Sequence, residues 1–298
     1  MIYRIWPLAL LAACGESTPD DPAEVSPAPL AAVSGSCPDL STSGLHEITS
    51  AGVTRTFHLF LPDEVEPGQP VFFSWHGLSA AEFDPAGGMA RGFGLEQLAR
   101  DRGVIVVVPE AQSTNLLGSE VMLWGILDDE DNDLALYDDL RTCLSEAHDV
   151  DLHRISSWGH SGGALWTALL VMERSDTLAS AVLSSGGVEL TLPLLGDRLA
   201  YRKPAVATPM IISSGGATDV WPDMSLPVIQ FDESSDLLAD NLHRDGHLVW
   251  RCRHNLGHVS LPQWFWPNAR RWMLRHRYGE PSPWEADEGG LEGDCEPM

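Results

Sequence analysis

The chain has 298 residues, of which 44% are hydrophobic and 20% are charged, and its formal net charge is −25. A chain of this length and composition can bury one sizeable hydrophobic core, which excludes a protein that is disordered throughout. A protein this acidic repels nucleic acids and anionic lipid headgroups, so neither class of ligand is expected.

The first residues resemble a bacterial export signal. A short basic start at residues 1–4 is followed by an apolar run at 5–13, which is too short to span a bilayer. Small residues come directly before Cys14, and this arrangement resembles the lipobox of bacterial lipoproteins, in which the Cys is acylated. We therefore expect residues 1–13 to be a signal peptide and Cys14 to carry a lipid that anchors the protein to the cell envelope. The alternative is an ordinary signal peptide on a secreted protein.

The two ends of the chain differ in composition from its middle. Residues 14–36 are rich in Pro, Ala, Ser and acidic residues and show no hydrophobic periodicity, which indicates a flexible tether. Residues 279–298 have a similar composition and are interpreted as an acidic low-complexity tail. The expected globular domain therefore spans residues 37–278.

Four cysteines follow Cys14, namely Cys37, Cys143, Cys252 and Cys295. An even number in an exported protein favours two disulfides. Their spacing is not that of a zinc site. The three possible pairings remain open from the sequence.

Short apolar runs alternate with segments of helical periodicity along the domain. In chain order the sequence predicts strands at 54–61 and 71–75, a helix at 94–102, a strand at 104–108, a helix at 134–148, a strand at 154–158, a helix at 164–174, strands at 179–184 and 210–214, a helix at 234–245, a strand at 248–252 and a helix at 268–277. This alternation predicts an α/β fold with a doubly wound, mostly parallel sheet flanked by helices. The connection at 186–208 is short, which leaves little room for a large lid domain.

Residues 159–163 have the sequence GHSGG and fit the pattern G-x-S-x-G, in which a sharp strand-to-helix turn exposes the Ser hydroxyl. A predicted strand precedes the motif and a predicted helix follows it, as the pattern requires. Ser161 is therefore the candidate nucleophile, and the alternative is a plain glycine turn. Ser185 also ends a predicted strand, but it lacks the leading glycine and is interpreted as a loop residue.

A serine hydroxyl needs a base, and the base needs a carboxylate that orients it. With this type of turn the order along the chain is Ser, then acid, then His. Asp219 follows a later predicted strand and His258 follows the last one, so these two complete the candidate triad. Asp223 and Asp232 compete with Asp219, which is favoured because it lies closest behind its strand.

An oxyanion hole needs two backbone N–H donors. One is expected from Gly162, which follows the candidate nucleophile, and the other from Leu78 in the loop after strand 71–75. His76 in the same loop is expected to brace the loop by hydrogen bonds rather than to react.

Several segments resemble polyhydroxybutyrate depolymerase-type and feruloyl-esterase-type α/β-hydrolases. The resemblance covers about residues 45–277 and is carried by residues 55–62, 72–77 and 99–109, the turn at Ser161, Asp219 and the Gly257-His258 pair. It implies an α/β-hydrolase fold and a secreted serine esterase that forms an acyl-enzyme and needs no metal cofactor. Two positions depart from the family pattern. Gly162 stands where these families usually have a polar residue, and Leu78 stands where a small residue or a cysteine is common.

Two tryptophans are candidates for the walls of a substrate pocket. Trp124 lies in the expected loop at 110–131, and Trp221 lies two residues after the candidate acid, where a packing role is an equal alternative. An open cleft suits short acyl or aryl esters, including hydroxycinnamoyl or hydroxyalkanoate esters, in a small molecule or a polymer. A serine peptidase on the same fold and a non-catalytic envelope lipoprotein are the alternatives.

The acidic run at 128–133 begins like a calcium loop but lacks the later glycine and glutamate of such loops. It is interpreted as the start of a helix, where acidic residues complement the helix dipole. No metal site is expected.

Overall fold

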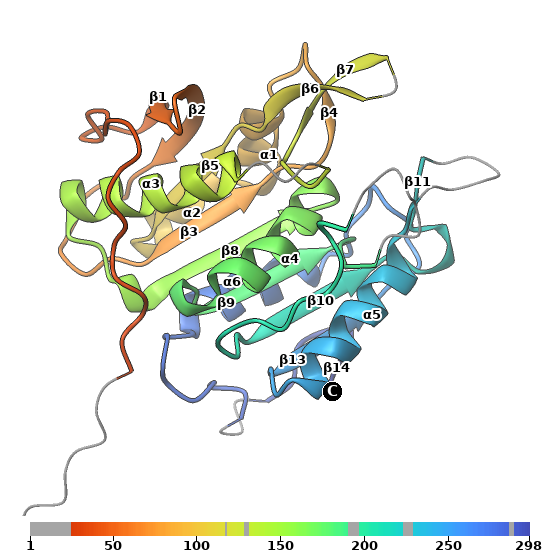
Figure 1. Cartoon of the computed structure of the whole chain (residues 1–298). Helices are drawn as coiled ribbons and strands as arrows, with labels where there is room; N and C mark the ends of the chain where they lie inside the picture. Colours follow the sequence, from red (N-terminus) through yellow and green to blue (C-terminus); the bar gives the residue numbers. More distant parts are fainter. Residues whose placement is uncertain (1–24, 117, 128–130, 190–196, 223–228, 286–288) are drawn as a thin grey trace, which may run out of the picture.

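The computed structural model describes residues 25–116, 118–127, 131–189, 197–222, 229–285 and 289–298 (Figure 1). The expected signal peptide, Cys14 and the competing Asp223 lie outside the described residues. Within the described part, no helix combines the length and the apolar character needed to cross a membrane.

A nine-stranded sheet forms the centre of the molecule (Figure 1). In spatial order its strands are β1 (Gly44–Ser50), β2 (Val53–Phe60), β5 (Ile105–Pro109), β3 (Val71–Trp75), β8 (Ile155–His160), β9 (Ser180–Ser184), β10 (Met210–Ser214), β13 (Val249–Arg253) and β14 (Asp294–Pro297). Neighbouring strands from β5 to β13 pair in parallel, whereas β1, β2 and β14 pair antiparallel. The parallel strands β3, β5, β9 and β10 are buried along their whole length, because helices cover both faces of the sheet.

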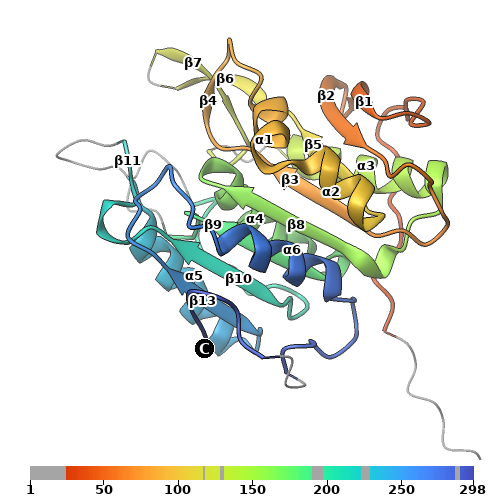
Figure 2. The ribbon, with the colours of Figure 1, turned by 180° about the vertical axis from the view of Figure 1, so that it is seen from behind.

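Among the described residues, six α-helices form the two outer layers. One face carries α3 (Asn132–His148), α4 (Gly162–Arg174) and α5 (Phe231–Arg244), and the other carries α1 (Pro85–Phe93), α2 (Leu95–Arg102) and α6 (Phe265–Arg275) (Figures 1 and 2). Side chains alternate along each strand, so Phe73 and Trp75 pack in the cluster of α3, α4 and α5, while Phe72 packs in the cluster of α1, α2 and α6. The predicted doubly wound architecture is confirmed.

Two small sheets stand at the carboxyl edge of the main sheet. One consists of β4 (Ser79–Ala80), β7 (Ser119–Leu123) and β6 (Gln112–Leu116), and the other of β11 (Val220–Trp221) and β12 (Ile229–Gln230). The sequence predicted a loop at 110–131, but much of this segment is the β6–β7 hairpin. Because β6 is largely exposed and polar, it lacks the apolar alternation by which a strand is recognised.

The described part of the expected tether, residues 25–36, lies against the domain. Ser34 donates hydrogen bonds from its N–H and its Oγ to the Asp139 carboxylate, at 2.8 and 2.5 Å, and Thr142 Oγ1 donates to the Ala31 carbonyl at 3.0 Å. A disulfide between Cys37 and Cys143 continues this attachment to α3. The sequence could not show that residues 25–36 lie against the domain, because they are held by hydrogen bonds and not by a periodic apolar face.

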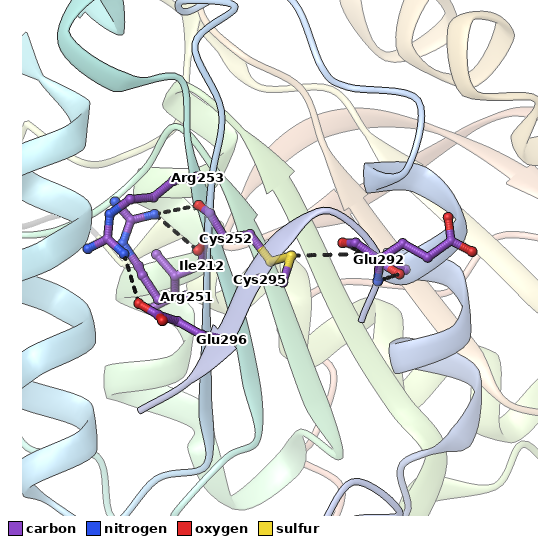
Figure 3. The surroundings of a disulfide bond; sticks show 8 residues. Ile212, Arg251, Cys252, Arg253, Glu292, Cys295 and Glu296 are labelled. Carbon is purple, nitrogen blue, oxygen red and sulfur yellow. Dashed lines mark hydrogen bonds and ion pairs between the residues drawn. A yellow bond between two sulfur atoms is a disulfide. The ribbon is translucent and has the colours of Figure 1, made fainter. Parts of the chain in front are cut away.

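The expected acidic tail also differs from the structure. Residues of β14 pair antiparallel with β13, and the two strands are joined by the disulfide between Cys252 and Cys295 (Figure 3). Nearby, Asn268 Nδ2 donates to the Glu292 carbonyl at 2.9 Å. Within the described part of this segment, Asp294–Pro297 therefore form an edge of the sheet, and Trp284 and Leu291 are buried in the core. Both predicted disulfides are confirmed, and their pairing is now defined.

Candidate active site

The G-x-S-x-G segment forms a tight turn between β8 and α4. Ser161 has φ 56° and ψ −121°, a conformation that non-glycine residues rarely adopt. A Cβ atom at Gly159 would lie 2.0 Å from the Gly163 carbonyl oxygen, and one at Gly163 would lie 2.0 Å from the Trp75 carbonyl oxygen. Both glycines are required because any side chain there would collide with the backbone. The turn lifts Ser161 above the carboxyl edge of the sheet.

Three predicted residues from separate loops meet at this edge. Ser161 Oγ lies 2.8 Å from His258 Nε2, and His258 Nδ1 lies 2.7 Å from Asp219 Oδ1. With the Nδ1 proton donated to the carboxylate, Nε2 can accept the hydroxyl proton of Ser161. Asp219 is buried, whereas the His258 side chain is 13% exposed. The arrangement can serve nucleophilic catalysis, in which a base activates the hydroxyl and a carboxylate orients the base.

The carboxylate of Asp219 is held on both oxygens. Its Oδ2 accepts hydrogen bonds from the Gly215 N–H at 2.6 Å and from Ser185 Oγ at 2.8 Å. Burial alone would raise the pKa of Asp219, but hydrogen bonds from His258, Gly215 and Ser185 outweigh it and lower the pKa below its ordinary value. The competitor Asp232 instead contacts Ser214 and Arg251.

The imidazole of His258 stands between two other rings. Phe231 stacks on it with ring centroids 4.4 Å apart, and His160 stacks on it at 5.4 Å. Burial lowers the pKa of His160 to about 4, so this ring is neutral near pH 7 and does not repel a proton arriving on His258. Sequence reasoning assigned no role at the site to Phe231, His160 or Ser185, because the G-x-S-x-G pattern leaves residue 160 unspecified and no motif contains the other two.

The two expected oxyanion donors lie beside each other. A Cβ atom built at Gly162 would lie 3.1 Å from the Leu78 backbone nitrogen and 3.3 Å from Leu123 Cδ1. A side chain at residue 162 would therefore fill the space beside the Leu78 amide, and the glycine leaves that space open. The Gly162 N–H is also among the free donors at the start of α4, where the helix dipole favours negative charge.

The loop that carries Leu78 is held from two sides. His76 Nδ1 donates to the Gly77 carbonyl at 2.6 Å, and His76 Nε2 accepts the Ala111 N–H at 3.0 Å. Burial lowers the pKa of His76 to about 4, which keeps this neutral tautomer near pH 7. Trp124 Nε1 donates to the His76 carbonyl at 2.8 Å. These contacts are those expected of a His that braces the loop.

The two tryptophan candidates differ in their surroundings. The Trp124 ring is 1% exposed and packs edge-on against Trp75, so most of it belongs to the core. Trp124 is also one of the residues that line a cavity of about 240 Å³, together with Leu123 and the more polar residues Gln112, Ser113, Thr114, Asn132 and Asp133. Trp221 in β11 is half-buried against the main hydrophobic cluster. A role for either ring in substrate binding stays a prediction.

In the described part of the acidic run, residues 131–133, two carboxylates form ion pairs and hydrogen bonds within the protein. Asp133 pairs with Arg55 at 2.7 Å and accepts the Gly125 N–H at 2.6 Å, and Asp131 pairs with Arg198 at 2.8 Å. The run leads into α3, as the helix interpretation predicted. Among the described residues no group of three or more His, Cys, Asp or Glu side chains is placed to hold a metal ion.

Known proteins share this architecture. The sequence profile of the prolyl oligopeptidase family matches residues 93–205, which include Ser161 but neither Asp219 nor His258. No curated protein matches the chain. The crystal structure of native sOPH has a TM-score of 0.70 at 16% identity and covers 89% of this chain and 97% of that chain. Native pOPH has a TM-score of 0.68 at 18% identity, covering 89% and 96%.

An esterase from the Planctomycetes species Thermogutta terrifontis, solved with propionate bound, has a TM-score of 0.53 at 16% identity and covers 74% of this chain and 86% of that chain. The chain has an α/β-hydrolase fold. At such low identities the likeness establishes the fold, and any activity has to be inferred from the site.

Proposed function

We propose that the protein is a serine ester hydrolase with Ser161, Asp219 and His258 as its catalytic triad. The observation that carries this proposal is the unbroken hydrogen-bond chain from Ser161 Oγ through the His258 ring to the Asp219 carboxylate. The proximity of the Leu78 amide to Gly162 supports it, since these two N–H groups would receive a negatively charged oxygen.

The reaction follows from these positions. Ser161 Oγ attacks the ester carbonyl carbon while its proton passes to His258 Nε2, and the carbonyl oxygen becomes an oxyanion facing the Leu78 and Gly162 amides. The bond to the alcohol oxygen then breaks, and the alcohol leaves with the proton from His258. Water attacks the resulting acyl-enzyme with the same proton transfers and releases the acid. Asp219 stays ionised and stabilises the imidazolium at each step.

The proposed substrates are esters with short acyl or aryl groups, including hydroxycinnamoyl and hydroxyalkanoate esters. The cavity of about 240 Å³ is lined by none of the triad residues, but it reaches Leu123, whose Cδ1 lies 3.3 Å from a Cβ atom built at Gly162. It is smaller than most ligand pockets and has a partly polar lining, which suits a short acyl group. An esterase of similar fold was solved with propionate, which is itself a short acid. A series of nitrophenyl esters of increasing acyl length should give falling rates. Rates that climb steadily beyond about ten acyl carbons would replace this proposal with a lipase.

The nucleophile is tested by Ser161→Ala, with Ser180→Ala as the matched control. Ser180 is also a buried serine, but it begins β9 at the opposite end of the strand, where its Oγ lies 3.1 Å from Ser156 Oγ. We expect Ser161→Ala to lower ester turnover by about 10⁴-fold or more with little change in Tm, and the control to stay active. A fluorophosphonate probe should label the wild type and not Ser161→Ala. A wild type without labelling would indicate a non-catalytic lipoprotein.

A serine peptidase is the second candidate, and the match of residues 93–205 to the prolyl oligopeptidase family favours it. The same triad and oxyanion donors can cleave an amide. Comparison of kcat/KM for nitrophenyl esters and for a panel of peptide nitroanilides decides between the two. Faster cleavage of the peptides would make the protein a peptidase.

The protein is further proposed to be exported and anchored through a lipid on Cys14. Two disulfides support an oxidising compartment. Cys14→Ala should release the protein from membrane fractions, and the intact mass of membrane-extracted wild type should include more than one acyl chain, since a single chain binds membranes only marginally. An unmodified Cys14 would contradict the anchor.

A further inference from the structure

The residue that directly follows β9 is a second strained residue near the nucleophile. Among the described residues, positive φ angles occur at five non-glycine positions, which are Ala51, Asp149, Ser161, Ser185 and Glu189. Ser185 has φ 54° and is 1% exposed, whereas Ala51, Asp149 and Glu189 are exposed. Buried backbone strain of this kind persists only where the surroundings enforce it, and it often marks a functional position.

The contacts of Ser185 explain why a serine occupies this position. Its N–H donates to the Ser213 carbonyl at 2.8 Å, which holds the backbone between β9 and β10. Its hydroxyl donates to Asp219 Oδ2 at 2.8 Å. Glycine would adopt this φ without strain, but it would leave the Asp219 oxygen without this donor.

The hydroxyl of Ser185 determines how the carboxylate is turned. The terminal torsion of an aspartate side chain is broad and weakly restrained by itself. Here Asp219 Oδ2 is held by two donors, the Ser185 hydroxyl and the Gly215 N–H, which come from different loops. With both donors in place, Oδ1 faces His258 Nδ1 at 2.7 Å. With the Gly215 N–H alone, the carboxylate could pivot about that single contact.

Ser184, the residue before Ser185, also contacts the active site. The Ser184 carbonyl accepts the Ser161 N–H at 3.0 Å, and Ser184 Oγ lies 3.0 Å from His160 Nδ1. Ser184, which ends β9, and Ser185, which follows it, therefore contact the backbone of the nucleophile, the ring stacked on His258, and the acid.

We propose that Ser185 is a positioning residue for the hydrolysis, whose hydroxyl fixes the rotation of the Asp219 carboxylate toward His258. The inference rests on the proposed function. Ser185 touches neither the substrate nor the reacting atoms, so its effect passes through Asp219 and His258. Its loss should therefore lower kcat and leave KM nearly unchanged.

The decisive variants are Ser185→Gly and Ser185→Ala, with Ser180→Ala as the control. Ser185→Gly removes the hydroxyl but also relieves the positive φ, which offsets part of the stability lost with the hydrogen bond, so its Tm should lie above that of Ser185→Ala. We expect both Ser185 variants to lower kcat by about 10-fold or more, with KM within about twofold, because a hydrogen bond to a buried charge is lost. A purely structural role would change Tm and leave kcat unaltered.

A spectroscopic measurement tests the same point without turnover. The His258 Nδ1 proton, which lies in the hydrogen bond to Asp219, should give a low-field proton resonance that Asp219→Asn abolishes. In Ser185→Gly this resonance should move upfield or disappear through exchange with water, whereas Ser180→Ala should retain it.

The outcomes separate the two proposals. If the wild type is active and Ser161→Ala is inactive, but Ser185→Gly keeps wild-type kcat and an unchanged resonance, the positioning role is overturned and the proposed function stands. If the wild type hydrolyses no ester, the proposed function fails, and an unchanged resonance in Ser185→Gly would separately overturn the role of Ser185.

Discussion

The carboxyl edge of the sheet and the two terminal segments are built in different ways. At the edge, the backbone passes so closely that only glycine fits at residues 159 and 163, and the buried Asp219 carboxylate has donors on both oxygens. The terminal segments, residues 25–37 and 289–298, lie on the outside of the domain, and each is linked to it by a disulfide.

The difference follows from what each region has to do. Catalysis needs side chains held within a fraction of an ångström, and adjacent parallel strands supply that rigidity. In the terminal segments Leu291 is the one buried residue among those the structure describes, so a covalent link that restricts the unfolded chain can supply stability there. Substitutions at the edge should therefore act on activity, and substitutions in the terminal segments should act on stability.

The largest effect is expected at the acid. Asp219→Asn should lower kcat by about 10³- to 10⁴-fold, because the amide no longer holds the imidazole in the required tautomer. Asp232→Asn is the matched control, since Asp232 contacts Ser214 and Arg251 and not His258. Activity per folded molecule, measured with a short nitrophenyl ester, decides between them. The opposite ranking would move the catalytic role to Asp232.

Gly163→Ala tests whether the edge depends on close backbone approach. A Cβ atom at Gly163 would lie 2.0 Å from the Trp75 carbonyl oxygen, so the variant should lose about 3 kcal/mol of stability or fail to fold. Gly88 lies exposed in α1, where a Cβ atom would meet nothing within 4 Å, so Gly88→Ala should gain roughly 0.5–1 kcal/mol. Urea denaturation of both variants measures the change in unfolding free energy. Equal changes in the two variants would refute the dependence on close backbone approach.

Removal of the disulfides tests the terminal segments. Replacing either cysteine pair with alanine should cost roughly 2–4 kcal/mol of unfolding free energy and leave kcat within about twofold. The sequence separations are 106 and 43 residues, so loss of the Cys37–Cys143 link should cost about 0.8 kcal/mol more than loss of the Cys252–Cys295 link. A large fall in kcat without the Cys252–Cys295 link would show that β14 supports the loop of His258.

The sequence predicted the parallel strands and most helices, because buried strands are continuous apolar runs between turn residues. It did not predict α1, whose Gly87, Gly88 and Gly92 are poor helix formers, nor the polar hairpin β6–β7. Chain order predicted which residues meet at the site, since strand ends at one edge converge. The contacts of Ser185 and Phe231 were out of reach, because they depend on three-dimensional packing that no local pattern encodes. Cysteine number predicted two disulfides, but pairing depends on which strands become neighbours.

The smallest expected effect concerns a carboxyl group behind the oxyanion loop. Glu110 directly follows β5, its Oε2 accepts the Ala86 N–H at 3.1 Å, and its Oε1 lies 3.5 Å from His76 Nε2. Burial raises the pKa of Glu110 from 4.5 to about 7. Between pH 4.5 and about pH 7, therefore, the Glu110 carboxyl is protonated in the folded protein and ionised in the unfolded chain. Stability linked to Glu110 is present below about pH 4.5 and is lost as pH rises toward 7.

Glu110→Gln should abolish this dependence, since the amide is neutral at every pH and can still accept the Ala86 N–H. Relative to wild type, the variant should gain about 1–3 kcal/mol of stability between pH 5 and pH 8. Urea denaturation at both pH values measures the change, with the exposed Glu66→Gln as control. If the difference in unfolding free energy between wild type and Glu110→Gln is the same at pH 5 and at pH 8, Glu110 is already ionised at pH 5. The carboxylate would then be stabilised where it lies, with the Ala86 N–H that its Oε2 accepts as the hydrogen-bond donor.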